Sequence, residues 1–490
     1  MSDDTIKLKE SFVQDLELQK QNLYNAFVFQ GMNPGENEGM NTLIPKVKDI
    51  EGNKPDIPVI KFYAPNASLN QLTQAQFNSI KNVINFNTLK DLSYFMYNQQ
   101  TLTLVDLSDL YIKPGTPVKY MLYNVTKPVK FSSRNDLTGI TDISYAFYHT
   151  SASNKFDLSS FILDETQPIE AYYAFANVEK LPSNYDKCTF IPRGLFAYAY
   201  KKDKGVLDTS LLQFDCGNYN ALNAFLNMFS SGIFDDVVFD LSFSNIKNFD
   251  GTAVTSASSS SGPFACSSSK SFTFINKDKC PLNMFAGLFG GLRTDSALDL
   301  TGLATNGASN FKNMCYTVKA TSVDVSDIDF SNATDTSSMF YSSTIQTINL
   351  GDADFSKVTT FSGMFYSCSG LTTVLHSTGI DASSAKVVAT SFASYSSSLV
   401  NLCPLLNLGK AYTQKSNNYS NYTLGLASCS KLTHESLIAI LDGLYDLNIS
   451  YNVANGGKLY TQKVALHATA KASLTAEEIA IATAKGWTVA

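Results

Sequence analysis

The sequence predicts an α/β solenoid, in which a short strand and a short helix recur from one repeat to the next. A pattern returns every 25 residues in the second half of the chain, and matched apolar positions extend it over about 300 residues. Of the 490 residues 44% are hydrophobic and only 16% are charged, so hydroxyl and amide side chains must cover much of the surface. Length alone would predict roughly three domains, but stacked repeats allow one elongated body to take up the whole chain.

The repeat is clearest between residues 310 and 370. The predicted core column consists of one large apolar residue, or two adjacent ones, from each copy. Its members are Met96, Leu122, Phe147, Phe175, Met314, Met339, Phe340, Met364, Phe365 and Phe392. Between Phe175 and Cys315 the register blurs, and a serine-rich stretch at 256–269 indicates an exposed loop.

Each copy predicts a turn of helix around its Met-Phe-Tyr sequence, followed by a strand such as Val323–Val325 or Thr347–Leu350. A single copy cannot bury its own apolar face, so neighbouring copies must stack and cover one another. Stacked strands lie about 4.8 Å apart. The length of such a body grows with the number of copies.

One phrase of the repeat carries a family resemblance. The sequence MFYSCSGL at 364–371, together with Asp-Leu-Ser at 157–159 and 240–242, resembles the BspA-type leucine-rich repeat. Cys368 and Leu371 match the cysteine and leucine of that family's helix, although most other copies carry Ser, Asn or Thr in place of the cysteine. The resemblance covers residues 91–410. It implies a leucine-rich-repeat solenoid of a kind found in bacterial surface adhesins and in phage proteins.

Residues 1–55 predict a helix, a glycine-bearing turn and a second short helix ahead of the repeats. Phe12, Leu16 and Leu23 fit a coiled-coil spacing over about two heptads. The segment is similar to one found near the ends of phage tail-fibre proteins, which implies an attachment or oligomerisation role. The residues assigned to that role are Phe12, Leu16, Leu23, Phe27, Leu43, Ile44 and Ile50. The alternative is a helical cap that shields the first repeat.

Two further segments are expected to close the solenoid. Residues 56–90 predict a linker and an N-terminal cap, and residues 411–490 predict a small α/β cap at the C-terminal end. In the latter, Ser436–Leu447 is amphipathic, and Thr475 with Glu478 forms a capping box before another helix. Trp487 is expected to cover the last apolar repeat and so protect an open sheet edge.

The sequence carries few signs of catalysis, so we expect no enzymatic activity, cofactor or metal. Its four histidines form no zinc-binding motif, its eight cysteines include no CxxC pair, and no nucleotide-binding or serine-hydrolase motif occurs. The cysteines are expected to be small buried apolar residues. The acids of residues 324–329 and 352–354 could form a carboxylate ladder for calcium. The favoured interpretation is that they cap turns by accepting from their own backbone.

Charge and hydropathy exclude two classes of partner. A net charge of −6 without basic runs argues against nucleic-acid binding and against a cationic face for anionic lipid. No stretch approaches the roughly 18 apolar residues of a membrane span, so no membrane insertion is expected.

Tyrosine is the strongest candidate for a binding role. The chain has 25 Tyr and 33 Phe but one Trp, on a background of Ser, Asn and Thr. Tyrosine gives a recognition surface contact area at little entropic cost. The phenylalanines of the repeat column are expected to be core, whereas Tyr148, Tyr341 and Tyr366 beside them are the predicted binding surface.

These observations lead to a hypothesis about function. We expect a structural or adhesion protein of a bacteriophage particle, tail-associated or fibre-like, that contacts other virion proteins or a protein or glycan receptor on the host. Residues 1–10 show no export signal, so we expect the protein to be made in the host cytoplasm and to reside in the virion. A homo-oligomer is expected, with the trimer as the usual solution for fibres.

Two alternatives remain open at this point. The first is a bacterial cell-surface adhesin of the BspA type. The second is a carbohydrate-active enzyme whose paired acids are brought together only by the fold.

Overall fold

The computed structural model describes the chain from residue 60 to its end, with gaps, in two compact units. The described ranges are 60–66, 68–148, 156–176, 178–196, 200–216, 225, 227–249, 262–266, 268–386, 391–412, 423–448 and 462–490. Unit 1 comprises residues up to Tyr200 together with Leu212–Phe214, and unit 2 comprises Lys201–Leu211 and Asp215–Ala490. Short parallel strands in many small sheets predominate in both, and helices are few.

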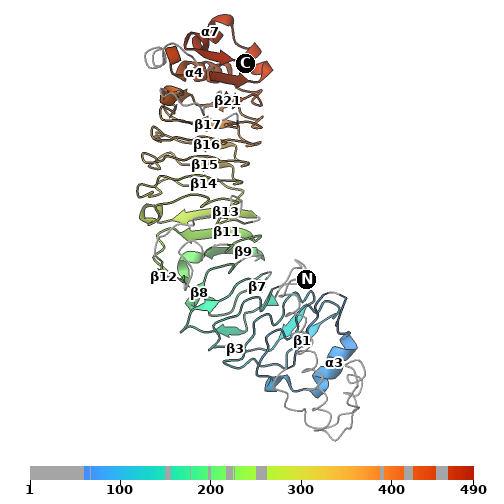
Figure 1. Ribbon diagram of the computed structural model, residues 1–490. Helices are drawn as coiled ribbons and strands as arrows, with labels where there is room; N and C mark the ends of the chain where they lie inside the picture. The colour runs from blue at the N-terminus through green and yellow to red at the C-terminus, as the bar shows by residue number, and fades with distance from the viewer. Residues whose placement is uncertain are drawn as a thin grey trace, which may run out of the picture. The chain divides into compact units, whose positions relative to one another are not determined.

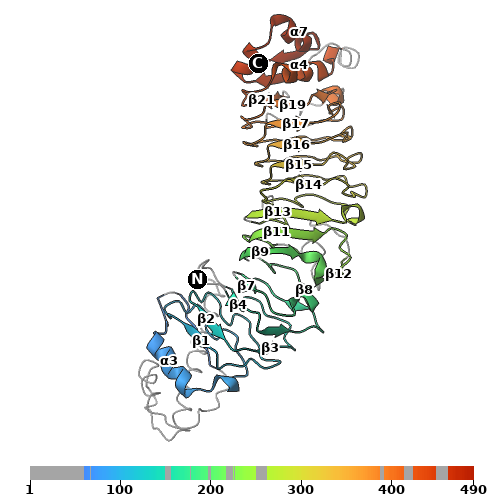
Figure 2. The same cartoon turned by 180° about the vertical axis from the view of Figure 1, so that it is seen from behind.

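Unit 1 is built from very short strands that pair in parallel with strands of neighbouring repeats (Figure 2). Strand β1 pairs with β2, β3 with β5, β4 with β7, and β8 with both β6 and β10. Their bounds are β1 Val105–Leu107, β2 Val129–Phe131, β3 Asn135–Leu137, β4 Phe156–Asp157, β5 Phe161–Leu163, β6 Ile169–Glu170, β7 Val178–Lys180, β8 Thr189–Ile191 and β10 Gln213–Asp215. Single-turn helix η2 (Phe86–Thr88) precedes β1, and η3 (Tyr185–Lys187) lies between β7 and β8 in the chain.

Helix α3 (Gln74–Val83) lies beside β1 at the start of unit 1 (Figure 2). It begins with a capping box in which Thr73 and Gln76 satisfy each other's backbone N–H groups. Phe77 and Ile80 on one face are buried, and Lys81 on the helix pairs with Asp106 of β1 at 3.2 Å. The helix therefore shields the first repeat and protects the outer edge of its strand.

Glutamine side chains complete the hydrogen bonding of this edge. The Gln74 side chain accepts from the N–H groups of Thr103 and Leu104 and donates to the Leu104 carbonyl. Gln99 is fully buried; its Nε2 donates to the carbonyl of Phe62 at 2.8 Å, and its Oε1 accepts from the N–H of Leu72 at 2.8 Å. Side-chain amides thus do here what the backbone of a preceding repeat would do.

Unit 2 contains the most regular stack, in which β14, β15, β16, β17 and β19 form one parallel sheet (Figure 1). The pairings Val323 with Ile348 and Ile348 with Val374 keep equivalent residues in register. The strands are β14 Leu298–Asp299, β15 Ser322–Asp324, β16 Thr347–Asn349, β17 Thr373–Leu375 and β19 Asn401–Leu402, with β18 Ile380–Asp381 pairing β20 Leu405–Leu406 alongside.

Longer strands lie where the repeat register of the sequence is blurred. Strand β11 (Ile233–Asp240) pairs in parallel with β13 (Ser268–Ile275), and β9 (Tyr200–Asp208) completes a sheet with β11. Strand β12 (Ile246–Lys247) and single-turn helices η4 (Thr209–Leu211), η6 (Lys277–Lys279) and η7 (Lys410–Tyr412) accompany this unit.

A short helix in each repeat was a wrong prediction. In the described repeats the Met-Phe-Tyr sequence forms a run of tight turns, which we call the turn segment, and it is not an α-helix. The segment at 336–343 shows why. The N–H groups of Ser338, Phe340 and Ser342 donate to carbonyls of the next repeat at 2.7–3.0 Å, while those of Met339 and Tyr341 donate three residues back within the segment.

Two residues of this segment, Ser338 and Ser342, adopt left-handed backbone (both φ 55), and the same spacing recurs at Tyr94 and Asn98. A left-handed residue stops helix propagation, and every second N–H then points out of the segment. The turn segments therefore extend the ladder of backbone hydrogen bonds between repeats beyond the strands themselves.

The residues of the sequence-derived core column lie inside the two units. Met96, Leu122, Phe147, Phe175, Met314, Met339, Phe340, Met364, Phe365, Cys368, Leu371 and Phe392 are each at most 1% exposed. Equivalent rings stack between repeats, as in Phe340 on Phe365 with ring centroids 5.8 Å apart. Each repeat thus covers the apolar face of the next.

The C-terminal segment closes unit 2 with a sheet of β21 (Thr423–Leu426), β22 (Gln462–Leu466) and β23 (Trp487–Val489), carrying α4 (His434–Gly443), α6 (Ala468–Ala472) and α7 (Ala476–Ala484). The predicted capping box of Thr475 and Glu478 is confirmed at the start of α7. Trp487 is 2% exposed, and its Nε1 donates to the Tyr445 carbonyl at 2.9 Å. Its ring lies against Gly409, just after the last strand of the stack, where a Cβ would approach it to 2.9 Å.

Among the described residues, no helix combines the length and the apolar character needed to cross a bilayer.

Replacing Gln99 with leucine should destabilise unit 1. The substitution leaves the N–H of Leu72 and the carbonyl of Phe62 without their partners, at a cost of about 1–3 kcal/mol for each buried group. Urea-induced unfolding measures the loss. Gln213→Leu on β10 is the matched control, since Gln213 is exposed. Equal stabilities of the two variants would contradict the role assigned to Gln99.

Candidate functional site

Two columns of tyrosine side chains run along the turn segments of unit 1. The Tyr97 ladder consists of Tyr63, Tyr97, Tyr123 and Tyr148, and the Tyr120 ladder consists of Tyr94, Tyr120, Tyr145 and Tyr173. Three turn segments contribute one ring to each ladder, because their two tyrosines lie three residues apart, as Tyr94 and Tyr97 do; Tyr63 and Tyr173 each extend one ladder alone. The ladders arise because the backbone bonds between repeats place equivalent residues directly above one another.

The rings within each ladder stack face to face. In the Tyr97 ladder the centroids are 4.6–4.9 Å apart with interplanar angles of 9–15°. In the Tyr120 ladder the separations are 4.7–5.3 Å and the angles 7–11°. Rings of the two ladders also contact each other, as Tyr120 and Tyr123 do at 5.6 Å. The faces of the rings are thus occupied by neighbouring rings, and the surface offers ring edges and hydroxyl groups.

All eight side chains are half-buried. Within the described residues, the hydroxyls of Tyr97, Tyr120, Tyr123 and Tyr145 receive no hydrogen bond from the protein, so the ring contacts account for their interactions. A phenol can donate one hydrogen bond and accept others. The ladders therefore present a row of donors and acceptors at the spacing of the repeats.

The phenols hold their protons firmly. Burial, followed by the neighbouring phenols, raises the pKa of Tyr97 and of Tyr145 well above the ordinary value of tyrosine. The pKa of Tyr120 is raised for the same reasons. The hydroxyls of these three residues are consequently neutral and able to donate over the whole physiological pH range.

Charged groups at the ladders are balanced. The Nζ atom of Lys61 lies 5.7 Å from the centre of the Tyr94 ring and 3.9 Å from the carboxylate of Asp91. Lys119, next to Tyr120 in sequence, binds Asp142 at 2.6 Å. The ladders therefore form a nearly neutral surface, which fits polar uncharged groups better than a dense polyanion.

The backbone beneath the Tyr120 ladder is unusual. Tyr94, Tyr120, Tyr145 and Tyr173 all have left-handed φ values of 56–61°. The equivalent positions in unit 2 are Gly287, Asn313, Ser338 and Gly363, which include the residue types that tolerate this conformation best.

An energetic comparison shows what the tyrosines contribute. Left-handed backbone costs a bulky residue roughly 1–2 kcal/mol, and an aromatic pair returns about 0.5–1.5 kcal/mol. Tyr120 and Tyr145 each belong to two stacked pairs, and the partial burial of the rings stabilises them further, so the stacking offsets the backbone strain. Left-handed tyrosine at four successive positions is uncommon, and such strain often occurs at functional surfaces.

A third column, the Tyr341 ladder, lies on unit 2. Tyr316, Tyr341 and Tyr366 stack at 4.8 Å with angles of 2° and 13°, and Tyr395 meets Tyr366 edge-on. Gly363 lies beside this column, where an added Cβ would come within 3.6 Å of the Tyr341 ring. Unit 2 therefore presents one row of phenols where unit 1 presents two.

The structure places the three predicted surface tyrosines in two different ladders. Tyr148 belongs to unit 1, and Tyr341 and Tyr366 belong to unit 2. The binding surface predicted from the sequence did not include most of the ladder members, among them Tyr94, Tyr97, Tyr120, Tyr123 and Tyr145. Their spacing of 25 or 26 residues within each column is the signal that could have found them.

The residues assigned to attachment lie outside the described part of the chain. They are Phe12, Leu16, Leu23, Phe27, Leu43, Ile44 and Ile50. Their role in attachment stays a prediction.

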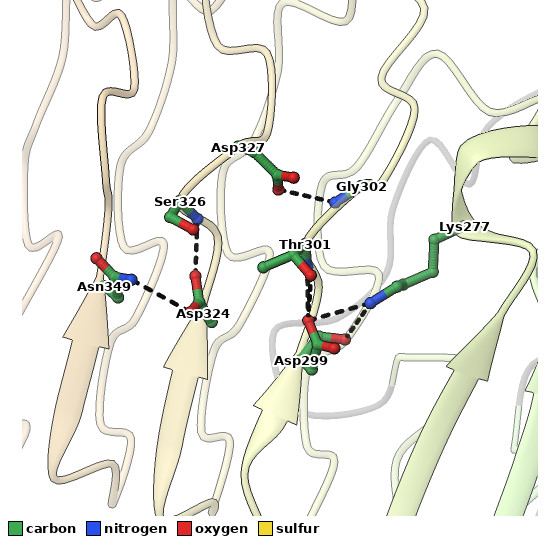
Figure 3. A network of polar contacts seen from close by, with 8 residues as sticks. All are labelled: Lys277, Asp299, Thr301, Gly302, Asp324, Ser326, Asp327 and Asn349. Atoms are coloured by element: carbon green, nitrogen blue, oxygen red, sulfur yellow. Dashed lines mark hydrogen bonds and ion pairs between the residues drawn. The ribbon is translucent and has the colours of Figure 1, made fainter.

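The aspartates of the stack serve its turns (Figure 3). Asp324 accepts from the N–H of Ser326 at 3.0 Å, and Asp329 and Asp354 bind Ser331 and Ser356 in the same way, which confirms the predicted turn caps. Asp327 instead accepts from the N–H of Gly302 in the preceding repeat, and Lys277 pairs with Asp299. In the described residues, no group of three His, Cys, Asp or Glu side chains could hold a metal ion.

The cysteines are chemically protected. All eight are free thiols and buried. Burial raises the pKa of Cys188, Cys368, Cys403 and Cys429 to about 12 and that of Cys266 and Cys280 to about 11. Because the thiolate is the nucleophile and the metal ligand, this environment makes them packing residues.

Alkaline pH should destabilise the protein through the ladders. Unfolded tyrosines ionise near pH 10, whereas the folded ladder phenols stay protonated, so above about pH 10 the folded state binds more protons than the unfolded state. The free energy of unfolding therefore falls as pH rises through this range. Urea unfolding between about pH 8 and about pH 12, with phenolate absorbance as a second readout, tests this. In Tyr97→Phe/Tyr145→Phe the decline should be smaller; an unchanged decline would refute the assignment.

Comparison with known proteins adds one finding. Residues 283–401, which include β14 to β17 and the Tyr341 ladder, are similar to a family described as "Mycoplasma protein of unknown function, DUF285". No curated protein and no solved structure matches the chain significantly. The similarity thus falls on the most regular repeats of unit 2 and carries no activity with it.

Proposed function

We propose that this protein is a non-enzymatic recognition or adhesion protein whose two tyrosine ladders on unit 1 contact its partner. The observation that carries the proposal is this double ladder, where four stacked tyrosines take up left-handed backbone at the surface. Tyrosine edges and neutral hydroxyls are typical of surfaces that bind through contact area and adaptable hydrogen bonds. The cysteines serve packing and the aspartates cap turns, which supports a role in binding and not in catalysis.

The repeats are proposed to be leucine-rich repeats of the BspA type. Two features support this. Cys368 and Leu371, which match the family's motif, are buried in the stack, and the strand of each regular repeat follows its turn segment as the motif order requires. The turn segment stands where the family's helix would be.

A bacteriophage particle is the proposed setting, with the chain as a tail-associated or fibre-like structural protein that binds virion proteins or a host receptor. The support comes from the sequence, through the similarity of residues 1–55 to tail-fibre ends and the polar, weakly charged composition. Residues 1–55 would attach or oligomerise the protein in that setting. The second candidate is a bacterial cell-surface adhesin, which the family similarity favours, since that family is described from Mycoplasma.

The ladder is tested by replacing strained tyrosines with a residue that suits the same backbone. In Tyr94→Asn/Tyr120→Asn/Tyr145→Asn the left-handed positions resemble Asn313, so relief of backbone strain offsets part of the lost ring contacts and the protein should stay folded, which circular dichroism checks. Binding of the labelled protein to intact cells of its bacterial host, measured by flow cytometry, should fall about tenfold or more.

Tyr395→Asn is the matched control, because Tyr395 is also left-handed (φ 64) but lies on unit 2. It should bind as the parent does. Unchanged binding by the triple variant, at unchanged stability, would remove the ladder from the contact surface. Mass spectrometry of purified phage particles and surface proteolysis of intact cells separate the two settings.

A further inference from the structure

Unit 1 has a cavity of about 640 Å³ that opens between two successive repeats. It is lined by Asn87–Lys90 from one repeat and Lys113–Thr116 from the next. These two loops run directly into the turn segments that carry Tyr94 and Tyr120. The volume lies within the usual range for sites that bind small groups.

The cavity carries unbalanced positive charge. Lys90 and Lys113 are exposed, and within the described residues neither forms an ion pair. The acids nearest to them in the sequence have other partners, because Asp91 lies near Lys61 and Asp109 pairs with Lys81. Asp136, whose N–H donates to the Ile112 carbonyl, binds Thr138 and lies near Arg134. The charge here thus differs from the balanced charge of the ladders.

The polar groups that line the cavity can donate hydrogen bonds to an acceptor group of a ligand. Thr116 is only 6% exposed, and its hydroxyl makes no hydrogen bond with the described residues, so it can donate to a bound group. The Asn87 side chain is already engaged with the backbone of Asp109 and Tyr111, which fixes one wall. A Cβ at Gly115 would meet nothing within 4 Å, so that side of the cavity is open.

We propose that this cavity binds the carboxylate or sulfate group of an acidic polysaccharide whose chain continues along the tyrosine ladders. The inference rests on the proposed function and names the partner class. Thr116 lies four residues before Tyr120, so the two are separated by at most about 14 Å of chain. A ligand of a few sugar units spans that distance, with its hydroxyls meeting the phenols.

Other polymers fit this surface less well. A nucleic acid needs many phosphate contacts, whereas the cavity offers two lysines and the ladders are balanced in charge. A peptide that adds as a strand needs free backbone groups, but the N–H groups of the turn segments at Tyr94, Met96, Tyr120 and Leu122 are bonded to the next repeat. A chain with abundant hydroxyls and sparse charge matches both features.

The test compares acidic glycans with neutral counterparts of the same backbone. The probes are oligosaccharides of polygalacturonate, hyaluronan and chondroitin sulfate, each beside its methyl-esterified or desulfated form, and isothermal titration calorimetry measures affinity. The parent protein should bind at least one acidic form about tenfold more tightly than its neutral form. Lys90→Met/Lys113→Met should lose that preference, and Lys130→Met/Lys187→Met, two exposed lysines elsewhere on unit 1, should keep it.

The outcomes separate the two proposals. Two results together support both proposals. Tyr94→Asn/Tyr120→Asn/Tyr145→Asn should lose all glycan binding, whereas Lys90→Met/Lys113→Met should still bind glycans but lose the preference for the acidic form. Binding that needs the tyrosines but ignores charge overturns the inference and leaves the ladder's role intact. Absence of binding to every acidic glycan, equal loss in the control pair, or tighter binding of polyglutamate or single-stranded DNA overturns the inference as well.

Discussion

The structure depends on backbone hydrogen bonds that run from each repeat to the next. They are formed by the short parallel strands and, equally, by the turn segments, where alternate N–H groups leave the segment and reach a carbonyl of the neighbouring repeat. These bonds fix the vertical spacing and the register together. Once both are fixed, every residue type that recurs in the sequence becomes a column in space.

The same register sorts the columns by environment. Residues such as Met339 and Phe340 face inward and stack on their equivalents, so the apolar face of each repeat is covered by its neighbours. The tyrosines of the turn segments lie at the boundary with solvent and stack there instead. The register set by backbone hydrogen bonds thus produces both the core and the aromatic columns at the surface. No other structural element is needed to align the tyrosines.

This bonding leaves backbone groups to be satisfied at the first described repeat of unit 1 and at the last repeat of unit 2. In unit 1 the amides of Gln74 and Gln99 bind such groups, while α3 covers the apolar face. At the C-terminal end of unit 2 a small sheet with α4 and α7 follows, and Trp487 buries its ring against the chain after β20. The capping contacts are thus mainly polar in unit 1 and largely apolar in unit 2.

The sequence by itself determined the period, the buried column, the strands near 323 and 347, the turn-capping aspartates and the capping box at Thr475, because each depends on a recurring pattern or on residues close together in the chain. Only the tertiary structure decided that the Met-Phe-Tyr sequence would turn and not coil into a helix, since bonds to the next repeat outcompete bonds within the segment. It also brought Tyr97 onto Tyr123 and Lys90 beside Lys113. Such neighbours are set by register between repeats, which no single repeat encodes.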